Sequence, residues 1–115
     1  MARIMVVEDE ALTGMMLAAA IEDAGHEVVG PFASLAPALQ AIEHGDMSGA
    51  ILDINLGRGV TSYPVARALL QAGIRFVFLT GYSREGIDPA FAAVPFFRKP
   101  LGEPHLRTMI ATLAR

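Results

Sequence analysis

The sequence contains no cysteine and carries little charge, and each shortage excludes some classes of protein. Without cysteine, neither a disulfide framework nor a thiolate metal site can form. Charged residues make up 18% of the chain and the net charge is −3, which argues against direct nucleic-acid binding through bulk electrostatics. Hydrophobic residues make up 53% of the 115 residues, enough for a core that is covered on both faces. We therefore expect one domain, over residues 1–115.

The chain also lacks a long apolar run. No stretch is long enough to cross a bilayer. Residues 1–3 lead directly into a short apolar stretch, which argues against a signal peptide. These absences predict a soluble, cytoplasmic protein that binds no membrane.

Lysine is nearly absent as well. Lys99 is the only lysine, whereas arginine occurs eight times. The scarcity alone is compatible with chance. However, Lys99 directly follows an apolar stretch and is itself followed by Pro100, and this position favours a functional role.

Four short apolar stretches each lead into a polar side chain. Residues 50–53 carry no charge before Asp53, which is typical of a strand buried on both faces. A carboxylate at the end of such a strand is costly unless it has a partner. If the strands are parallel, their ends meet along one edge of the sheet, where ligands bind in open α/β sheets. The other three stretches are residues 3–7 before Glu8 and Asp9, residues 75–79 before Thr80, and residues 94–98 before Lys99.

Helical patterns alternate with these strands. Apolar residues recur at helical spacing over residues 11–24, over residues 35–44, after Ser62 and from about residue 104 to 114. Ser34 and Ser62 precede the second and third helices and are predicted to cap them. A further strand, residues 26–30, has a polar start that suggests the edge of the sheet. The alternation predicts an α/β fold, with helices on both faces of a parallel sheet.

One face of the first helix carries apolar residues that should point away from the sheet. These residues are Leu12, Met15 and Ala19. They either dock a partner helix or are ordinary exposed side chains, and the sequence leaves both interpretations open.

The residues at the predicted edge suit phosphoryl transfer. Glu8, Asp9 and Asp53 offer the oxygen ligands that Mg²⁺ prefers, and a cation would relieve the repulsion between them. The carboxylate of Asp53 can act as a nucleophile and become an acyl phosphate. The Lys99 ammonium can neutralise charge on the phosphoryl oxygens, and the Thr80 hydroxyl can donate a hydrogen bond to one of them.

This set of residues, in this order along the whole chain, resembles the receiver domain of two-component response regulators. The resemblance implies a flavodoxin-like doubly wound sheet of five parallel strands in the order 2-1-3-4-5. It also implies that Asp53 is the phosphorylation site, that Thr80 and Lys99 are catalytic, and that the peptide bond between Lys99 and Pro100 is cis. Mg²⁺ would bind Glu8, Asp9, Asp53 and the backbone carbonyl of Asn55. The chain departs from the common pattern in having Glu8 where aspartate is common.

The resemblance further implies partners and activity. The donor would be the phosphohistidine of a histidine kinase or a phosphotransfer protein, and a downstream protein target would read the switch. The protein would be a monomer or a weak homodimer. It would not be a dedicated enzyme, although it would catalyse its own Mg²⁺-dependent phosphorylation and dephosphorylation.

Two other classes of function remain to be compared with this one. One is a pseudo-receiver or phosphate sink, a binding module without a phosphorylation-driven output, and the intact set of site residues argues against a pseudo-receiver. The other is an enzyme on a similar sheet, but the chain has neither the G-x-G-x-x-G turn nor the G-x-x-x-x-G-K-[ST] loop of nucleotide-binding enzymes.

The segment between Thr80 and Lys99 is shorter than usual in the family. Glycines and prolines interrupt residues 81–95, which predicts that the fourth helix is short or disordered and that this segment is the most mobile part of the unphosphorylated domain. By resemblance, Thr80 and Phe96 form the switch, and Asn55 and Tyr82 flank the path of water to the acyl phosphate. The bulky Tyr82 either shields that path or is an ordinary loop aromatic packed on the surface, and the sequence leaves both interpretations open. The run from Phe78 to Tyr82 is similar to the Phe-Ala-Thr-Gly-Tyr motif of small stand-alone receivers.

Overall fold

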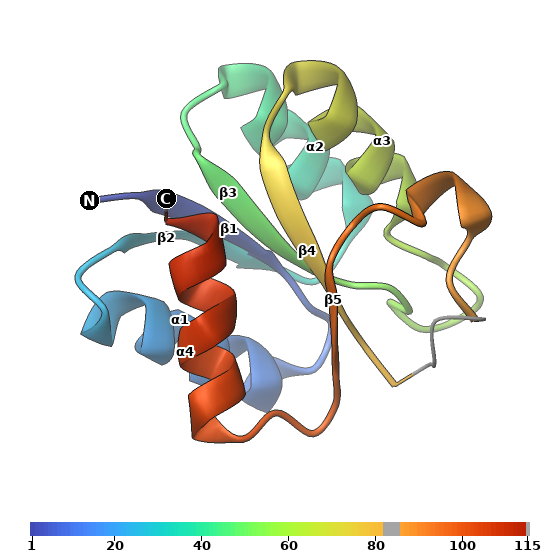
Figure 1. The fold of residues 1–115 in the computed structure, drawn as a ribbon. Helices are drawn as coiled ribbons and strands as arrows, with labels where there is room; N and C mark the ends of the chain where they lie inside the picture. The colour runs from blue at the N-terminus through green and yellow to red at the C-terminus, as the bar shows by residue number, and fades with distance from the viewer. Residues whose placement is uncertain (82–85, 115) are drawn as a thin grey trace.

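A single five-stranded parallel sheet forms the centre of the protein (Figure 1). The structure is a computed structural model that describes residues 1–81 and 86–114. The spatial order of the strands is β2-β1-β3-β4-β5, which confirms the predicted doubly wound fold. The strands are β1 (Arg3–Val7), β2 (Glu27–Phe32), β3 (Gly49–Asp53), β4 (Arg75–Thr80) and β5 (Phe96–Arg98).

Four α-helices of the described chain cover the two faces of the sheet, and each face has its own apolar core (Figure 1). Side chains alternate along the central strands, so that Leu52 joins the core under α2 and α3 whereas Ile51 joins the core under α1 and α4. Every residue of β3 is buried, as the uncharged stretch before Asp53 predicted. The helices are α1 (Ala11–Asp23), α2 (Leu35–His44), α3 (Tyr63–Ala72) and α4 (Glu103–Leu113).

The register of the strands brings the polar ends together. Val7 of β1 pairs with Leu52 of β3, so the residues that follow them, Glu8 and Asp53, lie at neighbouring strand ends. On the other side of β3, Asp53 itself pairs with Leu79, the residue before Thr80. Parallel pairing therefore places the site residues of three strands at one edge, as the sequence predicted.

The segment between β4 and β5 contains no α-helix among its described residues. One 3₁₀ turn, η2 (Pro89–Phe91), is present instead, so the prediction of a short fourth helix is confirmed for these residues. Ile87 and Phe91 both lie in the core beneath α2 and α3, which anchors the segment. Tyr82, predicted to flank the path of water to the acyl phosphate, lies outside the described residues.

One local prediction from the sequence was wrong, and another was right only in the position of the residues. The second strand does not end at Gly30 but continues to Phe32, whose carbonyl accepts a hydrogen bond from the Glu8 N–H at 2.9 Å. Proline is tolerated there because β2 is an edge strand. Ser34 and Ser62 do precede α2 and α3, but neither side chain makes a capping hydrogen bond.

Within the described ranges, no helix is both long and apolar enough to cross a membrane.

Candidate functional site

A cavity of about 380 Å³ opens at the carboxyl ends of β1, β3 and β4. Asp53 and Thr80, at the ends of β3 and β4, and Lys99, which directly follows β5, line this cavity. The loop after β3 forms another part of its wall. Thr80 lies at the end of β4 and is almost fully buried. The cavity is lined by Asp9, Glu10, Asp53, Asn55, Gly57, Thr80, Gly81 and Lys99.

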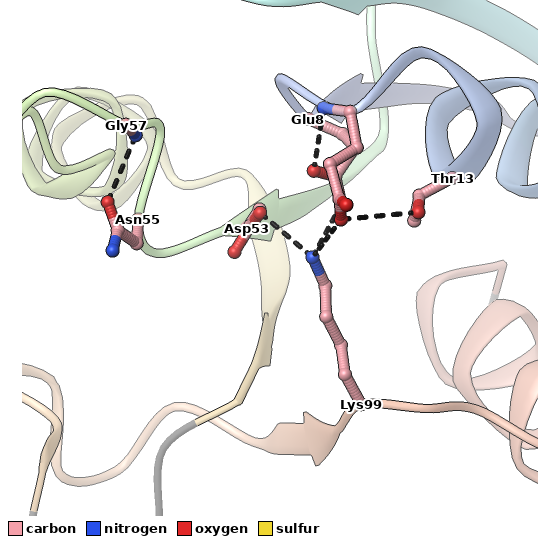
Figure 2. A network of polar contacts seen from close by, with 7 residues as sticks. Glu8, Thr13, Asp53, Asn55, Gly57 and Lys99 are labelled. Atoms are coloured by element: carbon pink, nitrogen blue, oxygen red, sulfur yellow. Dashed lines mark hydrogen bonds and ion pairs between the residues drawn. The ribbon is translucent and has the colours of Figure 1, made fainter.

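Lys99 reaches from the end of β5 into a group of carboxylates, as Figure 2 shows. Its Nζ lies 3.0 Å from Asp53 Oδ2, 3.1 Å from Glu8 Oε1 and 3.3 Å from Glu10 Oε1. Burial alone would lower the pKa of Lys99, but the close contacts with the Asp53 and Glu8 carboxylates outweigh it and raise the pKa above its ordinary value. Lys99 is therefore an ammonium ion at physiological pH.

Glu8 is a buried carboxylate, and only one of its two oxygens accepts a hydrogen bond. Oε2 accepts the backbone N–H of Glu10 at 3.1 Å. Oε1 faces Lys99 at ion-pair distance, yet it lacks hydrogen-bond geometry with any described residue. Burial raises the pKa of Glu8 to about 7, and the adjacent Asp53 carboxylate adds to the shift. A buried oxygen in this state is suited to a metal ion or a proton.

The donor set fits a hard divalent cation. Glu8, Asp9 and Asp53 can each contribute one carboxylate oxygen, and these oxygens lie within 4.8 Å of one another. Asp9 is exposed, which leaves one side of the group open to water. Mg²⁺ prefers oxygen ligands and keeps several waters, so a cluster that is half buried and half open suits it.

The loop after Asp53 leaves space around this cluster. Gly57 has a φ of +87°, and a Cβ atom at this position would lie 3.3 Å from Asp9 Oδ2. The Asn55 side-chain oxygen accepts the Gly57 N–H at 3.0 Å, so it points to the backbone of the loop (Figure 2). The role expected for Asn55 belongs to its backbone carbonyl, and its side chain serves the loop instead.

The structure brings most of the predicted residues together, but not all of them. Phe96 lies half-buried in the core beneath α2 and α3, opposite Phe78 in the register, and does not line the cavity. The peptide bond between Lys99 and Pro100 is cis. Glu10, which directly follows the acid pair, also contacts Lys99 and is a site residue that the sequence pattern did not predict.

Comparisons with known proteins identify the fold and the family. Neither the protein-family models nor the curated proteins compared with the chain match it. Among solved structures, SdrG from Sphingomonas melonis Fr1 is 38% identical, with a TM-score of 0.85 over 100% of this chain and 98% of that chain. The PhyR response regulator REC domain from Erythrobacter litoralis is 25% identical, with a TM-score of 0.84 over 98% of this chain and 89% of that chain.

A third matched structure is that of the response regulator TrrA from Thermotoga maritima in complex with Mg²⁺ and a beryllium fluoride. It is 25% identical, with a TM-score of 0.81 over 98% of this chain and 99% of that chain. These matches extend over almost the whole chain and show that it belongs to the receiver-domain family of response regulators.

Proposed function

We propose that the protein is a phospho-accepting receiver in which Asp53 takes a phosphoryl group from a phosphohistidine. The donor is a histidine kinase or a phosphotransfer protein, and phosphorylation changes the contacts with a downstream protein. The observation that carries the proposal is the position of Lys99 Nζ, 3.0 Å from Asp53 Oδ2, at the wall of an open cavity.

The reaction requires a nucleophile, charge neutralisation and room for the donor. An oxygen of Asp53 forms a bond to phosphorus while the P–N bond of the donor breaks, and the imidazole leaves with the electron pair. Lys99, held as an ammonium, offers positive charge to the phosphoryl oxygens. Thr80 lines the same cavity and offers a hydroxyl to one of these oxygens. The cavity is open to solvent, as entry of a second protein's histidine side chain requires.

Glu8, Asp9, Asp53 and the Asn55 backbone carbonyl would hold Mg²⁺. The buried Glu8 Oε1 without a hydrogen bond and the spacing of the three carboxylates support this assignment. When bound, Mg²⁺ supplies positive charge that offsets both the carboxylate cluster and the incoming phosphoryl group. The TrrA structure, solved with Mg²⁺ and a beryllium fluoride, supports the same class of ligand.

Uptake of phosphate from a small phosphodonor tests the proposal. The full chain is incubated with acetyl phosphate and Mg²⁺, and the bound phosphate per chain is measured. We expect Asp53→Asn to abolish uptake because an amide is a poor nucleophile. Asp23→Asn is the matched control: it makes the same chemical change at an exposed residue at the far end of α1 and should leave uptake unchanged.

The same measurement separates the alternatives. A pseudo-receiver takes up no phosphate in the wild-type form, which would overturn the proposal. A phosphate sink takes up phosphate but shows no change in protein contacts, so uptake is followed by a measurement of oligomeric state and of binding to the partner. Equal uptake by the wild type and Asp53→Asn would also contradict the assignment of Asp53.

A further inference from the structure

Tyr63, the first residue of α3, meets the ring of Phe78 in β4 edge to face at 6.0 Å. It makes two further contacts that no part of the proposed chemistry uses. Its hydroxyl oxygen accepts the backbone N–H of Asp88 at 3.0 Å. Its ring stacks on Phe91, with ring centroids 5.1 Å apart and an interplanar angle of 15°. Both partners belong to the segment that follows β4 in the chain. Tyr63 therefore joins the start of α3 to the turn η2, beside α3 in Figure 1.

The loop that leads from Asp53 to Tyr63 is held by backbone hydrogen bonds. The Ser62 N–H donates to the Ile54 carbonyl at 2.8 Å, and Asn55 forms an antiparallel bridge with Thr61. Ser62 is fully buried and its carbonyl accepts the first hydrogen bond of the helix, from Ala66. These bonds connect Ile54, the residue after Asp53, to Ser62, the residue before Tyr63.

The other partner, the segment 87–91, is packed as well as bonded. Ile87 and Phe91 are buried in the core, and Phe91 also meets the ring of Phe78 edge to face at 5.6 Å. Phe78 lies in β4, two residues before Thr80. The segment is thus attached on one side to the strand that ends in the switch hydroxyl and on the other side to Tyr63.

We infer that Tyr63 is a positioning residue that couples the loop after Asp53 to the segment 87–91. The hydroxyl provides the directional contact, because it bonds to one backbone N–H, and the stacked ring provides the packing. When the loop moves on phosphorylation, Tyr63 transmits the movement to residues 87–91 and so to the surface around them. The movement that Tyr63 transmits starts with phosphorylation of Asp53, so this part of the inference rests on the proposed function. The contacts of Tyr63 with Asp88 and Phe91 do not depend on it.

Tyr63→Phe is the informative variant, because it removes the hydroxyl and keeps the stacked ring. Thr108→Val is the matched control: it removes a hydroxyl that bonds to Pro104 within α4, on the opposite face of the sheet. In the free protein, amide hydrogen exchange followed by NMR should show the Asp88 N–H exchanging faster in Tyr63→Phe, on the order of tenfold. The Ala24 N–H, which bonds to the Ala20 carbonyl at the end of α1 on the opposite face of the sheet, serves as an internal reference.

A second measurement reports on coupling rather than on the contact. Chemical shifts are recorded with and without Mg²⁺ and beryllium fluoride as the phosphoryl mimic. We expect shift changes in the wild type both next to Asp53, at residues 54–57, and at residues 87–91. In Tyr63→Phe the changes at residues 54–57 should remain and those at residues 87–91 should fall at least severalfold, a pattern that a merely stabilising contact would not produce.

The outcomes distinguish a failure of the proposed function from a failure of the coupling role of Tyr63. If the mimic changes no shift next to Asp53 in the wild type, the proposed function fails, and the exchange of the Asp88 amide still decides whether Tyr63 holds the segment. If the mimic binds and residues 87–91 respond equally in the wild type and in Tyr63→Phe, the coupling role is overturned. Unchanged exchange of the Asp88 amide in Tyr63→Phe overturns the inference at its first step.

Discussion

Lys99 donates a hydrogen bond to Asp53 at 3.0 Å although 46 residues separate them in the sequence. The contact exists because β3 and β5 flank β4 in a parallel sheet, so their carboxyl ends lie at one edge. Without a cation, the ammonium is the positive charge that holds the carboxylates of Glu8, Glu10 and Asp53 together. Its loss should therefore affect both stability and signalling.

Lys99→Ala should lower the free energy of unfolding of the metal-free protein by about 2 kcal/mol, since it leaves the buried Glu8 and Asp53 carboxylates without a counter-charge. Mg²⁺ should restore part of this loss. Phosphate uptake should stay detectable, whereas the conformational response to it should disappear. Urea denaturation with and without Mg²⁺, together with uptake and chemical-shift changes, checks these outcomes. A variant that responds to the phosphoryl mimic as the wild type does would contradict this role of Lys99.

Asp9→Ala should affect phosphorylation more than stability. Asp9 is exposed and belongs to a group of like charges, so removing it relieves repulsion and should change stability by less than about 0.5 kcal/mol. The same change removes a proposed Mg²⁺ ligand, and we expect the Mg²⁺ affinity and the phosphorylation rate to fall by about tenfold or more. Titration with Mg²⁺ followed by NMR measures the affinity. Phosphorylation at the wild-type rate would show that Asp9 is not part of the site.

Gly57 and Gly59 form a matched pair in the loop after Asp53. Both have left-handed backbone conformations, with φ of +87° and +76°, so an alanine at either position should cost about 1 to 2 kcal/mol of stability. Only at Gly57 does the added Cβ meet another group, at 3.3 Å from Asp9 Oδ2, whereas the space around Gly59 is open. We therefore expect similar destabilisation by Gly57→Ala and Gly59→Ala, but weaker Mg²⁺ binding only in Gly57→Ala. Equal Mg²⁺ affinities in the two variants would contradict the role assigned to Gly57.

The pKa of Glu8 predicts how the stability of the metal-free protein depends on pH. Burial raises this pKa from 4.5 to about 7, so the folded protein holds the proton more tightly than the unfolded chain does. The resulting stabilisation is complete below the unfolded value of 4.5 and is lost as the pH rises through about 7. Urea midpoints measured in EDTA should fall over this range in the wild type and fall less in Glu8→Gln. The same pH dependence in both proteins would show that Glu8 is not the titrating group.

The site was predictable from the sequence because each strand is a short apolar run that ends in a polar residue. Once the strands are parallel, the order of residues along the chain already places Glu8, Asp53, Thr80 and Lys99 at one edge. The contacts that were missed depend on side chains far apart in sequence. The bond from the Asp88 N–H to Tyr63 spans 25 residues and leaves no periodic pattern. Glu10 was missed because an exposed acid at a helix start usually has only a local role.

The errors at Ser62 and at the end of the second strand arose because residue type alone does not show which tertiary contacts a residue makes. The capping prediction for Ser62 used residue type and position, but Ser62 is fully buried and its hydroxyl finds no partner among the described residues. The second strand was ended at Gly30 because glycine and proline usually interrupt strands, whereas pairing of Phe32 with Val7 continues β2. The predicted mobility of residues 81–95 stays a prediction, and residues 82–85 of this segment lie outside the described residues. Ile87 and Phe91 are buried, so we expect residues 87–91 to exchange more slowly than residues 92–95.

The central claim, that Asp53 is the phospho-acceptor, is tested most directly by locating the phosphoryl group on the chain. The protein is phosphorylated with a small phosphodonor and Mg²⁺, the acyl phosphate is reduced with borohydride to a stable product, and the modified residue is identified by mass spectrometry. We predict modification of Asp53 in the wild type and none in Asp53→Asn. Modification of Asp9, of Glu8 or of any other residue in place of Asp53 would contradict the account.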